Sequence, residues 1–160
     1  MQQRAILYAY FSLNLIEKVQ DWSRTRGIYD KSRWEVQELG AYQELGEFID
    51  AVLKNKPKEE QATELGDVIF YLINTYTMRG NKLSLDYMED FLEGGFKTEP
   101  SGDTYETCLA TFKDLTFLNL DRLTRCISYT PKECLEKAYI KVSARTGKMA
   151  ATGKFLKDNY

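Results

Sequence analysis

The sequence predicts an all-α fold, and three observations support this prediction. Apolar residues recur at helical spacing along most of the 160 residues. Prolines stand where helices would begin, at Pro57 and Pro131, and glycines where helices would end, at Gly27 and at Gly94-Gly95. No strand, internal repeat or low-complexity region is apparent along the chain.

The N-terminal half is expected to hold three helices. Apolar periodicity predicts the first helix over residues 4–24. The segment RTRGIYDKS forms a turn, and Ser32 at its end can cap a second helix over 33–54. Pro57 suits the first turn of a third helix, which runs to about Arg79.

The C-terminal half is expected to hold three more helices and a tail. The segment LDYMEDFL predicts a short helix that two glycines end, and a loop rich in Pro, Gly and Ser follows. Two longer helices come next, one from Asp103 or Thr104 to about Ser128 and one from 131 to about 145, with Thr130 as its cap. Residues 146–160 have no periodicity and are expected to form an irregular tail.

Length and composition favour one compact helical domain over residues 1–160. The chain is 43% hydrophobic and 13% aromatic, which is ample for a core. We expect an antiparallel helical bundle with a four-helix core and an additional helical insertion.

The net charge of −2, from 22 basic and 24 acidic residues, argues against a nucleic-acid-binding surface. No apolar run is long enough for a membrane span and the N-terminus does not resemble a signal peptide, so the cytoplasm is the expected location.

Histidine and cysteine usage narrows the chemistry. The chain has no histidine, which excludes Ser-His and Cys-His nucleophiles and histidine acid–base catalysis. Cys108, Cys126 and Cys134 match no zinc motif and are interpreted as free thiols. An enzyme built on this sequence would depend on carboxylates, metals, Lys, Arg or Tyr.

Two pairs of acids at helical spacing are the most informative feature. Glu44 and Glu47 form one pair, and Glu64 and Asp67 form the other. Residues at i and i+3 share one face of a helix, so each pair directs two carboxylates the same way. Such pairs also occur by chance on exposed helices, but here a turn between the pairs would bring the two helices back antiparallel. Four clustered carboxylates repel one another unless a cation neutralises them, and oxygen ligands suit Mg²⁺ or Mn²⁺.

Both pairs share the local form Glu-Leu-Gly-acid, with Gly46 and Gly66 before the last acid. Because glycine costs about 1 kcal/mol inside a helix, two at equivalent places indicate close packing or ligand approach. The double pattern resembles the MazG-like family of all-α nucleoside triphosphate pyrophosphohydrolases, whose signature is Glu-Glu-x-x-Glu followed by Glu-x-x-Asp. The resemblance covers about residues 35–76 and returns in KAYIKVSARTGKM near the C-terminus. It departs at Gln43, where the family often has an acid, which puts a fully occupied second metal in doubt.

Basic residues near the C-terminus are candidates for phosphate contact. Lys141 and Arg145 stand four residues apart on one helix face, and the resemblance implies that Lys and Arg at these places bind phosphate. Spacing alone fits an exposed basic stripe equally well. Lys148 is a third candidate for the same role.

Aromatic and amide side chains are candidates for contact with a base or sugar. Trp22, Tyr29 and Trp34 flank the turn between the first two helices, where aromatics more often serve packing. Trp34 lies about three turns before Glu44 and can share its face. Asn74 lies two turns beyond Asp67 and could bond a sugar or base, or another helix.

The sequence therefore predicts a Mg²⁺-dependent hydrolase, in which Mn²⁺ could replace Mg²⁺, that converts a (d)NTP to the monophosphate and pyrophosphate. Metal-activated water would attack the α-phosphorus, the two acid pairs would bind the metal, and Glu44 would also orient the water. The resemblance implies a homodimer or homotetramer. A dUTP/dUDP hydrolase, a phosphoribosyl-ATP pyrophosphatase and a non-catalytic partner-binding module remain alternatives, and the base, the sugar and the biological role stay open.

Overall fold

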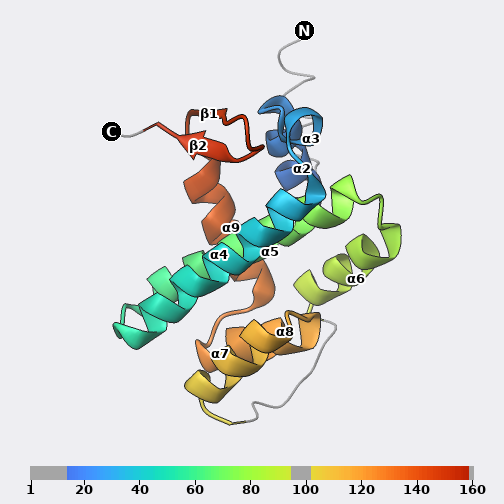
Figure 1. Ribbon diagram of the computed structural model, residues 1–160. Helices are drawn as coiled ribbons and strands as arrows, with labels where there is room; N and C mark the ends of the chain where they lie inside the picture. Colours follow the sequence, from blue (N-terminus) through green and yellow to red (C-terminus); the bar gives the residue numbers. More distant parts are fainter. Residues whose placement is uncertain (1–13, 95–101, 159–160) are drawn as a thin grey trace, which may run out of the picture.

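The computed structural model describes residues 14–94 and 102–158, and Figure 1 labels its elements. Its eight helices and two strands are α2 (Leu15–Thr25), α3 (Ile28–Lys31), α4 (Trp34–Leu53), α5 (Lys58–Met78), α6 (Lys82–Leu92), α7 (Thr104–Lys113), α8 (Phe117–Cys126), α9 (Pro131–Ser143), β1 (Gly147–Met149) and β2 (Phe155–Lys157). The all-α prediction is confirmed, since the two short strands form the only sheet of the described residues. No helix in these two ranges is long and apolar enough to cross a membrane.

The two longest helices, α4 and α5, form the centre of the molecule. They are joined by the short turn 54–57 and lie against each other, with α9 packed along α5 (Figure 1). Their facing apolar residues are fully buried, as Leu45 and Phe48 of α4 and Leu65 and Ile69 of α5 show. This packing holds the two acid-bearing faces in a fixed relation.

Gly66 sets the distance between α5 and α9. A Cβ atom at this position would lie 1.9 Å from the carbonyl oxygen of Cys134, well inside van der Waals contact. The absence of a side chain therefore lets the two backbones approach closely, and the expectation of close packing at Gly66 is confirmed. Gly46 differs, because a Cβ there would meet no atom within 4 Å.

Two of the predicted helix starts are confirmed by their caps. Thr130 accepts a hydrogen bond from the backbone N–H of Glu133, and the Glu133 carboxylate accepts one from Thr130, while Pro131 takes the first helical position. Asp103 and Glu106 form the same reciprocal arrangement at the start of α7. Each cap satisfies backbone donors that the first helical turn would otherwise leave unpaired.

Other predicted boundaries in the N-terminal half are wrong. Asn14 has an extended backbone and caps α2, so a single helix does not run through it, and residues 4–13 lie outside the described residues. The expected turn contains the short helix α3, and Ser32 does not cap α4 because its Oγ accepts from the Gln37 side chain. Pro57 is the residue before α5 and not part of its first turn.

The single helix expected to reach Ser128 is also wrong, because the chain breaks into α7 and α8. Thr116 starts the second helix by accepting a hydrogen bond from the Asn119 backbone N–H. The Asn119 side chain donates to the carbonyls of Ala110 and Asp114, at 3.3 and 2.7 Å. These bonds satisfy backbone acceptors at the end of α7, which makes the break stable.

The predicted irregular tail is wrong as well, since β1 and β2 pair as an antiparallel hairpin with Met149 opposite Phe155. Phe155 packs edge-on against Trp22 of α2, with ring centroids 5.4 Å apart. Gly153 has a φ of +84° and lies against Ser32. Strands of three residues are too short to give a periodic signal, so the tertiary contact with α2 decides their conformation.

Candidate metal centre

Three acids from two helices converge between α4 and α5. Glu44 of α4 and both Glu64 and Asp67 of α5 offer carboxylate oxygens that all lie within 4.8 Å of one another. The i, i+3 spacing of Glu64 and Asp67 directs both side chains toward α4. The structure thus brings together three of the four predicted metal ligands.

Without a cation, burial and mutual repulsion disfavour the ionised form of these acids. Burial raises the pKa of Glu44 to about 7, and the negative charges of Asp67 and Glu47 add to this effect. Burial also raises the pKa of Glu64 and of Asp67. A bound cation would reverse these shifts, because it favours the ionised form of every neighbouring carboxylate.

Glu47 stands apart from the other three acids. Its side chain is exposed, and it does not belong to the group of converging oxygens. It remains close enough for its charge to contribute to the raised pKa of both Glu44 and Glu64. The arrangement is therefore a triad of one buried and two half-buried acids with a fourth acid at its rim, and not the symmetrical quartet that the two pairs predict.

Lys141 of α9 forms an ion pair with the Oδ2 atom of Asp67. Asp67 is only 5% exposed, so this ammonium group is a close counter-charge for a buried carboxylate. Arg145 lies just beyond the end of α9, and its charge also acts to lower the pKa of Asp67, against the larger effect of burial. Lys141 and Arg145, two of the three predicted basic residues, therefore lie beside the triad.

The hairpin supplies two further basic residues that the sequence analysis missed. Lys157 of β2 lines the same pocket as Glu44 and Asp67, and its charge acts to lower the pKa of all three triad acids. Lys154 donates hydrogen bonds to the Gln43 side chain at 3.0 Å and to the Tyr71 hydroxyl at 2.9 Å. Gln43, where the family often has an acid, thus contacts a lysine. Only recognition of the hairpin would have placed these lysines near the acids.

Lys148 does not join the other basic residues. Residues of a strand alternate between its two faces, and Lys148 pairs with the exposed Leu156. Phe155 and Lys157, the neighbours of Leu156, occupy the other face, where Phe155 packs on Trp22 and Lys157 lines the pocket of the triad. Lys148 is therefore on the outer face of the hairpin.

A narrow pocket extends from the triad toward the hairpin. Its lining includes polar and aromatic side chains from α2, α4, α5 and β2 and from the segment just beyond α9, among them Trp22, Gln37, Asn74, Arg145 and Phe155. The indole N–H of Trp22 is buried and has no hydrogen-bond partner among the described residues. The cavity volume is about 40 Å³. A cavity of this size holds a few water molecules and is too small for a nucleoside.

Two of the three predicted base-contacting residues line this pocket, and the third does not. Trp22 lines this pocket, and so does Asn74, which accepts from the Tyr29 hydroxyl at 2.9 Å and donates to Gln37 at 3.3 Å. Asn74 is therefore an interhelix hydrogen-bonding residue in this structure. Trp34 is not part of the lining, because it lies at the start of α4 with the Arg79 guanidinium 4.6 Å above its ring.

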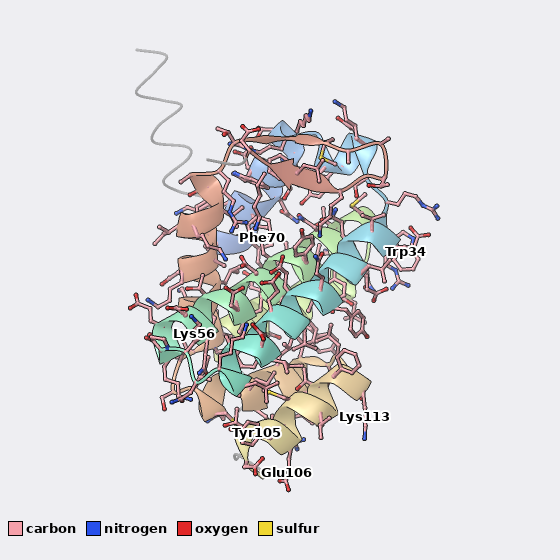
Figure 2. The ribbon with its side chains drawn as sticks, turned by 60° about the vertical axis from the view of Figure 1, so that its left-hand side comes forward. Trp34, Lys56, Phe70, Tyr105, Glu106 and Lys113 are labelled. Carbon is pink, nitrogen blue, oxygen red and sulfur yellow. The ribbon has the colours of Figure 1, made fainter. Side chains whose placement is uncertain are left out.

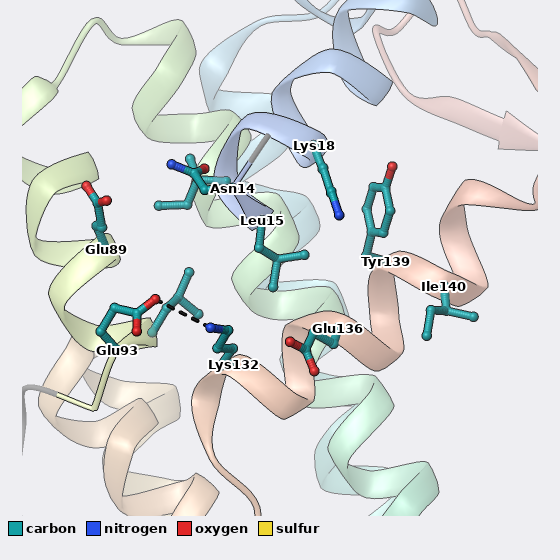
Figure 3. Close-up of a pocket in the computed structure, with 11 residues that line it drawn as sticks. Asn14, Leu15, Lys18, Glu89, Glu93, Lys132, Glu136, Tyr139 and Ile140 are labelled. Atoms are coloured by element: carbon teal, nitrogen blue, oxygen red, sulfur yellow. Dashed lines mark ion pairs between the residues drawn. The ribbon is translucent and has the colours of Figure 1, made fainter. Parts of the chain in front are cut away.

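A second, larger groove of about 530 Å³ lies between α2, α6 and α9. Figure 3 shows its acids spread around the rim, with Glu93 in an ion pair with Lys132 at 3.5 Å. None of these acids belongs to a cluster of converging carboxylates. Within residues 14–94 and 102–158, the carboxylates that converge are those of the triad. The groove therefore has a larger volume but no cluster of converging acids, and the triad remains the candidate site.

The chemistry of the triad fits a hard divalent cation. Mg²⁺ is commonly held by one or two carboxylates and completes its octahedron with water and substrate phosphate. Glu44, Glu64 and Asp67 offer hard oxygen ligands, and the surrounding lysines and arginine would attract an anionic substrate to the same place. Comparison of the chain with protein-family models, with curated proteins and with solved structures finds no match, so the cation site is inferred from these residues alone.

Proposed function

We propose that this protein is a divalent-cation-dependent nucleoside triphosphate pyrophosphohydrolase that converts a (d)NTP and water into a (d)NMP and pyrophosphate. The observation that carries the proposal is the convergence of Glu44, Glu64 and Asp67 within 4.8 Å, with Lys141 beside them. Acids alone would support a cation site. Acids surrounded by basic side chains support a site for a cation and a polyphosphate together.

The chain's own residues divide the work in this proposal. Glu64 and Asp67 hold the cation, and Glu44 both holds it and accepts a proton from the attacking water. When bound, Mg²⁺ neutralises charge on the phosphates and activates water for attack on the α-phosphorus. Mn²⁺ is expected to substitute, since it prefers the same oxygen ligands.

The ion pair between Lys141 and Asp67 gives Lys141 two roles. In the structure its ammonium balances the buried Asp67 carboxylate. A divalent cation would take over that balance, which frees Lys141 to contact the β- or γ-phosphate. Arg145 and Lys157 would meet the remaining phosphate oxygens, since both line the pocket next to Asp67.

The base is expected to enter between the hairpin and α2. Trp22 and Phe155 supply aromatic surface there, and the unpaired indole N–H of Trp22 offers a hydrogen-bond donor. Phe155 and Lys157 of β2 line the narrow pocket, and in this proposal a movement of the hairpin opens it for the base. The helices α2, α4, α5 and α9 form the bundle core in this proposal.

Pyrophosphate release from a panel of ordinary and modified NTPs and dNTPs tests the proposal. We expect hydrolysis with Mg²⁺, its loss in EDTA, and its return with Mg²⁺ or Mn²⁺. In water labelled with ¹⁸O, the label should appear in the monophosphate, because water attacks the α-phosphorus. Label in inorganic phosphate would indicate a phosphatase instead, and hydrolysis that persists in EDTA would contradict the metal site.

A further inference from the structure

Lys154, in the turn of the hairpin, holds a half-buried ammonium group beside the metal centre. Its Nζ atom donates to the Gln43 side chain at 3.0 Å and to the Tyr71 hydroxyl at 2.9 Å, and both acceptors are neutral. Among residues 14–94 and 102–158, no carboxylate forms an ion pair with it. The described side chains thus accept from two of its three N–H groups. Because a desolvated cation without an anion is destabilising, this arrangement favours an anionic ligand at the third.

The two acceptors place this ammonium at one end of the acid cluster. Gln43 precedes Glu47 by four residues on α4, and Tyr71 follows Asp67 by four residues on α5, so each stands one helical turn from an acid on the same face. Since the short turn makes α4 and α5 antiparallel, both steps lead toward the N-terminal end of α4. Figure 2 shows the hairpin on the side of the molecule toward that end, where Trp34 is labelled, and away from the α4–α5 turn.

Packing on both sides keeps the ammonium in this position. A Cβ at Gly40 would overlap the Tyr71 ring, so the missing side chain makes room for the ring that presents the hydroxyl. The Nζ atom of Lys154 lies 4.6 Å from the centroid of the same ring, within the range of a cation–π contact. On the hairpin side, the neighbouring Gly153 lies against Ser32. A charged group held in this way is suited to bind a ligand at a defined point.

The charges of the centre balance with one divalent cation. The three triad acids and Glu47 carry four negative charges when all are ionised, which by charge alone could balance two divalent cations. Lys141, paired with Asp67, and Lys154 carry two positive charges, so one divalent cation completes the balance. Burial lowers the pKa of Lys154, and the charge of Glu44 is close enough to act against that effect. Centres for phosphoryl transfer commonly use two cations, and here a lysine is available as the second.

We propose that the Lys154 ammonium serves as the second cation of this centre, so that each chain binds a single divalent cation, and that its third N–H group contacts the triphosphate. Gln43 fits this role, because a neutral amide accepts a hydrogen bond from the ammonium and brings no charge for a second metal ion. The phosphate contact rests on the proposed function, whereas the number of bound cations does not depend on any reaction.

Titration calorimetry of the metal-free full chain with Mn²⁺ alone tests the number of cations. We expect one Mn²⁺ ion per chain in the wild type, a count that needs no substitution. Two tightly bound Mn²⁺ ions would overturn this proposal and leave the proposed function standing. No bound Mn²⁺ would contradict the metal centre itself and, with it, both proposals.

An exchange of charge at Lys154 tests its part in that count. The double variant Gln43→Glu with Lys154→Ala should bind two Mn²⁺ ions per chain, because a carboxylate is gained and the ammonium is lost. Gln43→Glu with Lys148→Ala is the matched control, since Lys148 is on the outer face of the hairpin. The control should bind one Mn²⁺ ion, because the ammonium remains to pair with the new carboxylate. The same count in both double variants would overturn the proposal.

Binding of inorganic tripolyphosphate at saturating Mg²⁺ tests the phosphate contact separately. Lys154→Met, which keeps the length of the side chain without its charge, should bind tripolyphosphate roughly tenfold more weakly than the wild type, the effect of one lost charge-assisted hydrogen bond. Lys148→Met should bind it as the wild type does. Tryptophan fluorescence shows whether the hairpin stays in place, because Phe155 packs on Trp22. Equal affinities of the two variants for tripolyphosphate would overturn the contact.

Discussion

Asp67 illustrates how single residues define the candidate site. Its carboxylate is almost fully buried, its counter-ion comes from another helix, and its neighbours are two further acids. A buried charge destabilises the fold unless an opposite charge and hydrogen bonds compensate it. Packing alone therefore does not explain a carboxylate at this position. The cation binding proposed for the triad would account for it.

The four predicted ligands are expected to differ in importance. Asp67→Asn should lower turnover by roughly 100-fold or more, since a buried oxygen ligand and its charge are both weakened. Glu47→Gln should lower it by less than about tenfold, because Glu47 is exposed and acts only as a nearby charge. Pyrophosphate release at saturating Mg²⁺ measures both, with the exposed Glu60→Gln on α5 as the control. Equal losses in Asp67→Asn and Glu47→Gln would contradict the triad.

Lys141→Ala is expected to have opposite effects on the metal and on the substrate. Removal of the ammonium leaves Asp67 free, so apparent Mg²⁺ affinity measured by titration calorimetry should rise. Triphosphate use should fall by roughly 10- to 100-fold in kcat/KM, the effect of one lost charge-assisted hydrogen bond. Lys148→Ala, on the outer face of the hairpin, is the matched control and should change neither quantity. Lower Mg²⁺ affinity in Lys141→Ala would show that Lys141 organises the acids and does not compete with the cation.

At the scale of elements, the close contact between α5 and α9 holds the basic residues of α9 beside the acids of α5. Gly66 permits that contact, and α9 carries Lys141 to Asp67. The hairpin adds Lys154 and Lys157 from the segment after α9. The site is therefore assembled from elements that are distant in sequence.

Alanine substitutions at the two equivalent glycines should have opposite effects on the free energy of unfolding. Gly66→Ala should destabilise the fold by about 1–3 kcal/mol or more, because its Cβ meets the backbone of α9. Gly46→Ala should stabilise the fold by about 0.5–1 kcal/mol, since its Cβ meets nothing. Urea denaturation of each variant beside the wild type measures both. A stabilised Gly66→Ala would show that α9 does not pack as closely as described.

At the scale of the whole molecule, the titration of the triad acids makes the free energy of unfolding depend on pH. The pKa of Glu44 in the fold is about 7, above the ordinary value of 4.5. The fold therefore binds this proton more tightly than the unfolded chain does, and its stability falls as pH rises from about 4.5 to 7.

We expect the metal-free protein to lose on the order of 1–2 kcal/mol of unfolding free energy across this range through Glu44, since solvent screens a half-buried group. Glu44→Gln should lack this loss, and saturating Mg²⁺ should reduce it, because a bound cation stabilises the ionised acids. Urea unfolding at pH 5 and pH 7.5, with and without Mg²⁺, measures the effect. A Glu44→Gln variant with the same pH dependence as the wild type would assign the effect to other groups.

Local signals in the sequence determined the helices and the acid faces. The i, i+3 pair of Glu64 and Asp67 and the caps at Thr130 and Asp103 depend only on residues within one or two helical turns, so their placement follows from the chain itself. The resemblance implied that Lys141 binds phosphate, which stays a prediction, and the structure places its ammonium against Asp67.

Only the tertiary structure decided what depends on contacts between distant segments. Lys157 reaches the triad, and Lys148 does not, because the hairpin packs Phe155 on Trp22 and so fixes which face of β2 turns inward. Glu47 lies at the rim, because α5 packs against the Leu45 and Phe48 side of α4. Gly46 and Gly66 have the same local sequence, yet Gly66 faces α9 and Gly46 faces open space. Such outcomes depend on packing across the molecule, which no short stretch of sequence encodes.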